Sequence, residues 1–180
     1  GGSLGGIMGT MTVAVEPEIH AAAFQVPGAS FVQLITTSSA TVSPLVSTIA
    51  TGTFGIQGDE VLDEYHPVAL LLGAITEAGD PIAYAPHLLQ SPIVDRQPPD
   101  LLITYALDDE VLPNISTHAL LRAIGLDLAT PRLVPVDGAR GRLPVGHPEP
   151  AVVGGVVAPR VGSVGIGVLH DPVGRAVRGV

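Results

Sequence analysis

Gly1-Gly2-Ser3-Leu4-Gly5-Gly6 opens the chain and fits the Gly-x-Ser-x-Gly pattern of a nucleophile elbow. In this turn a serine stands between a strand and a helix, with its hydroxyl clear of the backbone. So strained a turn predicts that no Cβ fits at the flanking glycines. The apolar run that follows predicts a helix over residues 4–15, and the amide of Leu4 would face a developing oxyanion. Because the chain holds 22 glycines, a flexible linker or tag remnant is the alternative interpretation.

Downstream, short apolar runs alternate with segments of helical spacing. This alternation predicts an α/β fold whose strands are parallel neighbours covered on both faces. A strand is expected before Gly1, because a nucleophile elbow follows one. Residues 29–58 leave helix and loop open, and the Gly/Val-rich tail 147–180 has room for one last strand at 161–169. The predicted strands are 19–26, 101–107 and 132–136, and the predicted helices are 4–15, 67–78 and 116–125.

The composition narrows the class of protein. Of the 180 residues, 46% are hydrophobic and 14% charged, which favours one folded domain. A net charge of −9, an absence of lysine and 3% aromatic residues argue against a nucleic-acid partner. The absence of cysteine excludes disulfides, thiol catalysis and cysteine metal sites. No apolar run reaches the roughly 18 residues of a membrane-spanning helix.

Two carboxylates follow the predicted strand 101–107, in the stretch Asp108-Asp109-Glu110-Val111-Leu112-Pro113. Active sites of open α/β sheets lie at the carboxyl ends of strands, so both are candidates for a catalytic acid. Asp109, four residues before Pro113, is the preferred one. The alternative is that Asp109 only stabilises the N-terminus of the next helix.

Three histidines follow the acid in the chain, and two of them are candidates for the base, since His118 falls on the surface of a predicted helix. A general base has to reach the serine hydroxyl and be oriented by the acid. His170 ends the apolar run 164–169, where a strand would pass into a loop, and is preferred to His147, which stands in a Gly-His-Pro loop. A loop histidine without a catalytic role is the alternative for either.

The order of these motifs resembles that of the α/β-hydrolases, in which the serine precedes the acid and the acid precedes the histidine. Residues 80–86, 109–114 and 123–126 resemble those of bacterial lipase- and esterase-like members, and the resemblance covers about residues 1–136. It implies a partial α/β-hydrolase fold with parallel strands and flanking helices, whose N-terminal strands precede this chain. Residues 1–180 would then be the C-terminal part of one domain, with a lid or cap within 29–98.

The same resemblance implies the roles of the site residues. Ser3 would be the nucleophile, His170 the base and Asp109 the acid that orients it, and the Leu4 amide would form half of the oxyanion hole. The substrate would be a small-molecule or lipid ester, and neither a metal nor an organic cofactor is implied.

The end of the chain departs from the family pattern. Members often end in a His-Gly pair after the last strand, and residues 170–176 can be aligned so that Arg175 takes the position of the base. Arginine cannot accept a proton at neutral pH. The second oxyanion donor of the family comes from a loop upstream of the elbow. The alternative function is therefore that of a degenerate, non-catalytic domain with a structural or binding role.

Overall fold

The computed structural model describes residues 1–38, 48, 52–56, 60–129, 136–137, 141–142 and 156–158. Its strands form one five-stranded sheet in the order β1-β2-β5-β3-β4. β1 and β2 are parallel and pair from Ala21 opposite Asp100 to Gln25 opposite Thr104, as the sequence predicts. β5 runs antiparallel to both β2 and β3, so the sheet is mixed and the expectation of parallel strands alone is wrong. The strands are β1 Ala21–Gln25, β2 Asp100–Thr104, β3 Asp127–Ala129, β4 Gly141–Arg142 and β5 Val156–Ala158.

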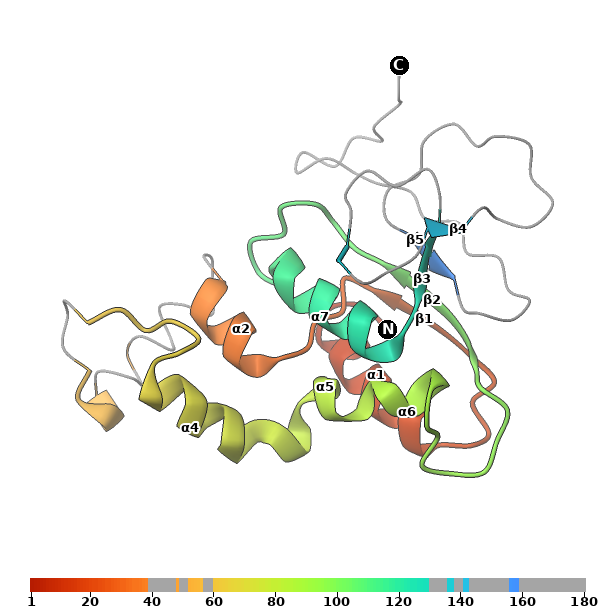
Figure 1. Cartoon of the computed structure of the whole chain (residues 1–180), viewed down its shortest axis with the longest axis horizontal. Coiled ribbons are helices and arrows are strands. Elements are labelled where there is room, and N and C mark those ends of the chain that lie inside the picture. Colours follow the sequence, from red (N-terminus) through yellow and green to blue (C-terminus); the bar gives the residue numbers. More distant parts are fainter. Residues whose placement is uncertain are drawn as a thin grey trace, which may run out of the picture.

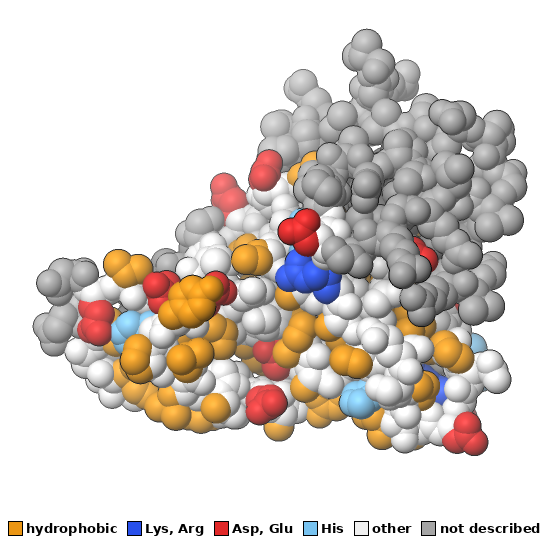
Figure 2. All heavy atoms as spheres, viewed as in Figure 1, with side chains coloured by type: hydrophobic (Ala, Val, Ile, Leu, Met, Phe, Trp, Pro, Cys, Tyr) orange, Lys and Arg blue, Asp and Glu red, His pale blue; other side chains and the backbone are white. Residues whose placement is uncertain are grey.

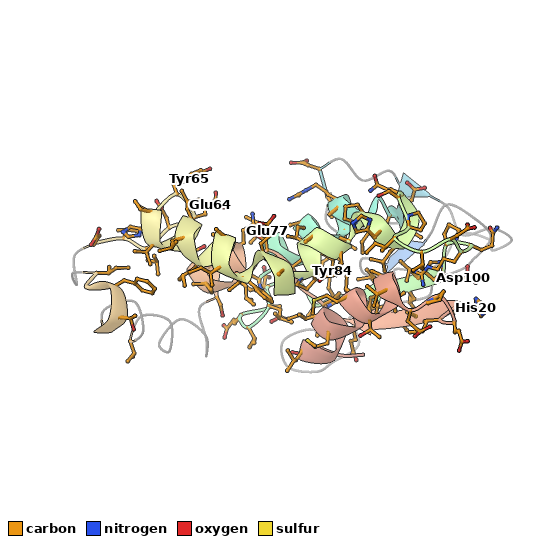
Figure 3. All side chains as sticks on the ribbon, turned by 90° about the horizontal axis from the view of Figure 1, so that it is seen from below. His20, Glu64, Tyr65, Glu77, Tyr84 and Asp100 are labelled. Atoms are coloured by element: carbon orange, nitrogen blue, oxygen red, sulfur yellow. The ribbon has the colours of Figure 1, made fainter. Side chains whose placement is uncertain are left out.

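The helices form a layer against the sheet and an arm beside it (Figure 1). α1 packs on β1, while α5 and α6 contact both α1 and α7, so these four helices share one layer. α2 and α4 pack on each other and form the arm at the left of Figure 1. The helices are α1 Leu4–Val15, α2 Phe31–Thr37, α4 Pro67–Thr76, the 3-10 turn η1 Glu77–Gly79, α5 Pro81–Tyr84, α6 Pro86–Leu89 and α7 Asn114–Ile124.

Several predicted elements are confirmed, with altered ends. α1 covers the predicted range, and α4 with η1 ends one residue beyond it. β2 ends at Thr104, so residues 105–107 belong to the loop that follows. α7 begins at Asn114, two residues before the predicted start at Ser116. Residues 132–135 of the predicted third strand and the predicted strand 161–169 lie outside the described residues.

The segment 29–98 divides between the arm and the helical layer. α2 and α4 contribute to the arm, whereas α5 and α6 pack against α1 and α7. No single described helix is long and apolar enough to cross a bilayer; Pro67–Gly79 and Pro81–Leu89 reach that length only together, across a bend of 52°.

A close contact joins α1 to β1. A Cβ on Gly9 would lie 2.7 Å from Cε1 of Phe24, whose side chain is buried in the core. Glycine at position 9 therefore lets the helix approach the ring. The opposite face of β1 is exposed at Ala21, Ala23 and Gln25. β1 is thus covered on one face, and the expectation of cover on both faces is wrong for this strand.

The core lies between the sheet and the helical layer. α7 contributes three fully buried aliphatic side chains, which meet buried residues of β1, β2, α1 and α6. Burial of large aliphatic side chains is the main stabilising contribution to this layer. The core residues of these elements are Val13, Ala14, Phe24, Leu88, Leu101, Ile103, Leu120, Leu121 and Ile124.

Truncation of a core leucine is expected to destabilise the protein far more than the same change on the arm. Leu121 has no exposed surface, whereas Leu70 on α4 is 58% exposed. Leu121→Ala leaves a cavity and is expected to lower the free energy of unfolding by about 3 kcal/mol. Leu70→Ala is the matched control, with an expected change within about 0.5 kcal/mol. Urea unfolding monitored by circular dichroism measures both, and equal losses would contradict the assigned core.

Candidate active site

Ser3 lies where an extended segment turns into a helix. Gly2 forms a parallel bridge with Gln25 at the end of β1, and the Ser3 amide donates to the Gln25 carbonyl at 2.9 Å. α1 begins at the next residue, Leu4. The predicted strand-to-helix turn is therefore confirmed, and it lies at the carboxyl end of β1.

The backbone of Ser3 differs from that of an ordinary helix-capping serine. A capping serine has extended dihedral angles and accepts a hydrogen bond from the first turn of its helix. Ser3 has φ 51° and ψ −119°, and its side chain makes no capping hydrogen bond. A non-glycine residue in such a conformation costs about 1–3 kcal/mol. The hydroxyl is thus exposed and is not used by α1, although its position carries strain.

The two glycines that flank Ser3 in the motif differ in their surroundings. A Cβ on Gly1 would overlap the carbonyl group of Gly5, whose carbon would be 2.5 Å away. A Cβ on Gly5 meets nothing within 4 Å among its neighbours. The steric requirement predicted for both glycines is confirmed at Gly1 and is wrong at Gly5. The crowded glycine after the serine is instead Gly6, where a Cβ would lie 3.0 Å from Cβ of Pro27.

The amide of Leu4 stands at the N-terminus of α1. Among the described residues, the Ser3 carbonyl accepts from Gly6 and Ile7, and Gly5 donates to Gly2, but no hydrogen bond uses the Leu4 amide. The first amides of a helix are unsatisfied and attract negative charge. The Leu4 N–H, adjacent to the exposed Ser3 hydroxyl, is therefore free to donate to an oxyanion.

Residues with strained backbone conformations lie at the carboxyl edge of the sheet. Within the described residues, positive φ at non-glycine positions occurs at Ser3, Val26, Ser30 and Asp108. Val26 and Ser30 bound the loop after β1, and Asp108 lies in the loop after β2. Strained residues persist where surrounding contacts enforce them, and they cluster at functional sites.

Asp109 is held by the loop that follows β2. Its Oδ1 accepts hydrogen bonds from the amides of Val111 and Leu112, both at 2.9 Å. The residue is half-buried, and no described residue bonds its Oδ2. Because α7 begins only at Asn114 with Pro113 as its N-cap, Asp109 does not cap the helix. One carboxylate oxygen is thus fixed by backbone amides, while the other makes no hydrogen bond to a described residue.

Asp108 is exposed and differs from its neighbour. Its amide donates to Oδ1 of Asn114 at 2.8 Å, and Nδ2 of Asn114 donates to the Ala106 carbonyl at 2.6 Å. The Asn114 side chain therefore bridges Ala106 and Asp108 and fixes the part of the loop that directly precedes Asp109. This role was not predicted, because its one signal in the sequence is an asparagine directly after a proline.

The strand order separates Ser3 from Asp109 by one strand. Ser3 follows the segment beside β1, and Asp109 follows β2 on the other side of β1. Two strand spacings amount to roughly 10 Å. The predicted base His170, its alternative His147 and Arg175 lie outside the described residues.

Two titratable side chains, Tyr105 and His118, meet between the end of β2 and α7. Tyr105, directly after β2, is buried, and its hydroxyl lies 3.2 Å from Nε2 of His118 on α7. The rings meet edge to face, with centroids 5.3 Å apart. Burial raises the pKa of Tyr105. Burial and nearby Arg122 lower the pKa of His118, while Asp137 acts in the opposite direction.

The lowered pKa of His118 predicts a pH-dependent contribution to stability. The unfolded chain, with an imidazole pKa of about 6.5, binds more protons than the folded one just below that pH. The contribution is complete above pH of about 6.5 and is lost as pH falls through the folded pKa. Urea unfolding at about pH 7.5 and about pH 5 should show a smaller loss in His118→Gln than in the wild type. An equal loss in both proteins would contradict the assignment.

The sequence matches no known protein-family model and no curated protein.

Proposed function

We propose that the protein is a serine hydrolase of the lipase and esterase type that cleaves carboxylic esters. The observation that carries the proposal is the backbone of Ser3, a strained residue between a segment parallel to β1 and the start of α1. Neither an ordinary cap nor a linker accounts for that conformation. A nucleophile elbow accounts for it, since it presents the serine hydroxyl beside helix amides.

The proposed reaction uses Ser3, Leu4 and Asp109 together with the base that the sequence predicts, His170. Ser3 Oγ attacks the acyl carbon, and its proton passes to the imidazole of His170. The resulting oxyanion accepts a hydrogen bond from the Leu4 amide, and the imidazolium is oriented by Oδ2 of Asp109. The alcohol leaves with the proton of the imidazolium. Water then attacks the acyl-enzyme by the same steps in reverse and frees Ser3.

The proposed substrate is a neutral ester. A net charge of −9 disfavours anionic ligands, and the segment between the elbow and the acid loop supplies apolar side chains for an acyl group. Leu4 and Met8, on the first turns of α1, are large apolar residues that are more than half exposed. They offer an apolar surface next to the nucleophile.

Covalent labelling tests this function directly. A fluorophosphonate reacts with an activated serine, loses fluoride and adds one phosphonyl group to Oγ. Incubation of the full-length protein should place one adduct on the peptide that contains Ser3, as read by mass spectrometry. Ser3→Ala should carry none, and Ser91→Ala, which removes an exposed hydroxyl after α6, should be labelled like the wild type. An unlabelled wild type would favour the non-catalytic alternative.

A further inference from the structure

The loop that joins β1 to α2, residues 26–30, borders the proposed site. Ser3 follows the segment on one side of β1, and Asp109 follows the strand on its other side. The β1–α2 loop leaves the end of β1 between them and is tied to β2 by the Val26 amide, which donates to the Thr104 carbonyl at 2.6 Å. Its position therefore limits the space between nucleophile and acid.

This loop is strained at both ends. Val26 has φ 44° and Ser30 has φ 61°. A β-branched residue at positive φ is rare, and such a conformation persists only when the surroundings enforce it. The contacts that enforce it here come from residues far away in the sequence.

Two buried hydroxyls of α7 hold the middle of the loop. Thr117 Oγ1 donates to the Pro27 carbonyl at 2.7 Å. Ser116 Oγ donates to the Ala29 carbonyl at 2.6 Å and accepts from the Ala29 amide at 3.0 Å. Ser116 is 0% and Thr117 1% exposed, so water does not compete for these bonds.

A buried carboxylate holds the far end of the loop. Oδ1 of Asp80 accepts from the amides of Ser30 at 2.9 Å and Ile82 at 3.0 Å, and Oδ2 accepts from the amide of Phe31 at 2.5 Å. Asp80 is 6% exposed. It therefore joins the loop to the first turns of both α2 and α5.

Most of the buried polar side chains form hydrogen bonds to the loops of this edge. In the part of the chain that the structure describes, they are Thr10, Ser38, Asp80, Ser116 and Thr117. Three of them hold the β1–α2 loop, and Ser38 donates to the Glu110 and Val111 carbonyls of the acid loop. Thr10 alone bonds within its own helix, to the Gly6 carbonyl. Apolar packing would suffice for a role in folding alone, whereas fully satisfied polar bonds fix one loop geometry.

We propose that Thr117, Ser116 and Asp80 are positioning residues, which keep the β1–α2 loop clear of the space between the Ser3 hydroxyl and the Asp109 carboxylate. This inference rests on the proposed function, because it gives the loop a role in turnover. Without the hydrogen bonds from these three side chains, movement of the loop relieves the strain at Val26 and Ser30. A shift of about 1 Å in a reacting geometry costs up to about 10²-fold in rate.

Paired substitutions at Thr117 separate positioning from folding. Thr117→Val keeps the shape and removes the hydroxyl, whereas Thr117→Ser keeps the hydroxyl and removes the methyl group. The full-length protein is titrated with fluorophosphonate, so that kcat for a p-nitrophenyl ester is expressed per reactive serine. We expect Thr117→Val to lower this kcat by roughly 10- to 100-fold, and Thr117→Ser to retain it. Thr10→Val is the matched control: an equally buried threonine hydroxyl is lost, and kcat per site is retained.

The outcomes distinguish the two proposals. A wild type that takes up no fluorophosphonate overturns the proposed function and this role of the loop together. A labelled wild type with an unchanged kcat per site in Thr117→Val overturns the positioning role alone, even if thermal stability falls as it does in Thr10→Val. Ser116→Ala and Asp80→Asn repeat the measurement at the other two contacts. A kcat per site equal to that of the wild type in either variant overturns the positioning role of the residue that it replaces.

Discussion

Ser3→Ala is expected to lower kcat for hydrolysis of a short-chain ester by about a million-fold. The reason is that the hydroxyl is the only group on this turn that can form the acyl-enzyme, while its backbone is retained by alanine. The residual rate would come from the Leu4 amide and from substrate binding. Stopped assays with a p-nitrophenyl ester, on protein purified from a host without background esterase activity, measure the loss.

Ser3→Gly distinguishes loss of chemistry from loss of structure. Glycine adopts positive φ without penalty, so this variant relieves the strain at φ 51° and is expected to raise the free energy of unfolding by about 1 kcal/mol. It should be as inactive as Ser3→Ala. A more stable and inactive protein indicates that the strain serves the reaction. Retained turnover in both variants would refute Ser3 as the nucleophile.

Asp109→Asn is expected to lower kcat by about 10⁴-fold. The amide oxygen of asparagine can still accept from the Val111 and Leu112 amides, so the loop keeps its geometry. The amide nitrogen that replaces Oδ2 cannot accept the imidazole N–H, and the base takes the wrong tautomer or orientation. Kinetic assays with the wild-type ester substrate check this, with circular dichroism to confirm that the fold is retained.

Asp108→Asn is the matched control for this change. Asp108 carries the same charge one residue earlier, and its side chain is exposed. It makes its described hydrogen bond through its backbone amide, to Asn114. We therefore expect its kcat to stay within about threefold of the wild type, as for a surface substitution away from the site. If Asp108→Asn is the inactive variant, the acid has been assigned to the wrong carboxylate.

The sequence by itself determined the local features of the site. The spacing of Gly1, Ser3 and Gly5 predicted the turn and the helix that follows, because a steric motif of adjacent residues needs no distant partner. The apolar runs predicted β1, β2 and their parallel pairing, since buried parallel strands are continuously apolar. The carboxylates after β2 were predicted to lie at the carboxyl edge from the chain order alone.

Only the tertiary structure decided which of these residues are fixed by hydrogen bonds and which groups form those bonds. The amides of Val111 and Leu112 hold the carboxylate of Asp109, and the positions of these amides depend on the path of the loop into α7. The antiparallel β5 was not predicted, because the pairing of so short a strand with β2 and β3 depends on long-range contacts and not on local periodicity. The clamp of Thr117, Ser116 and Asp80 joins residues 49–90 positions apart. Hydrogen bonds between such distant residues exist only after the chain has folded, since their geometry depends on how α7 and the residue before α5 meet the loop that follows β1.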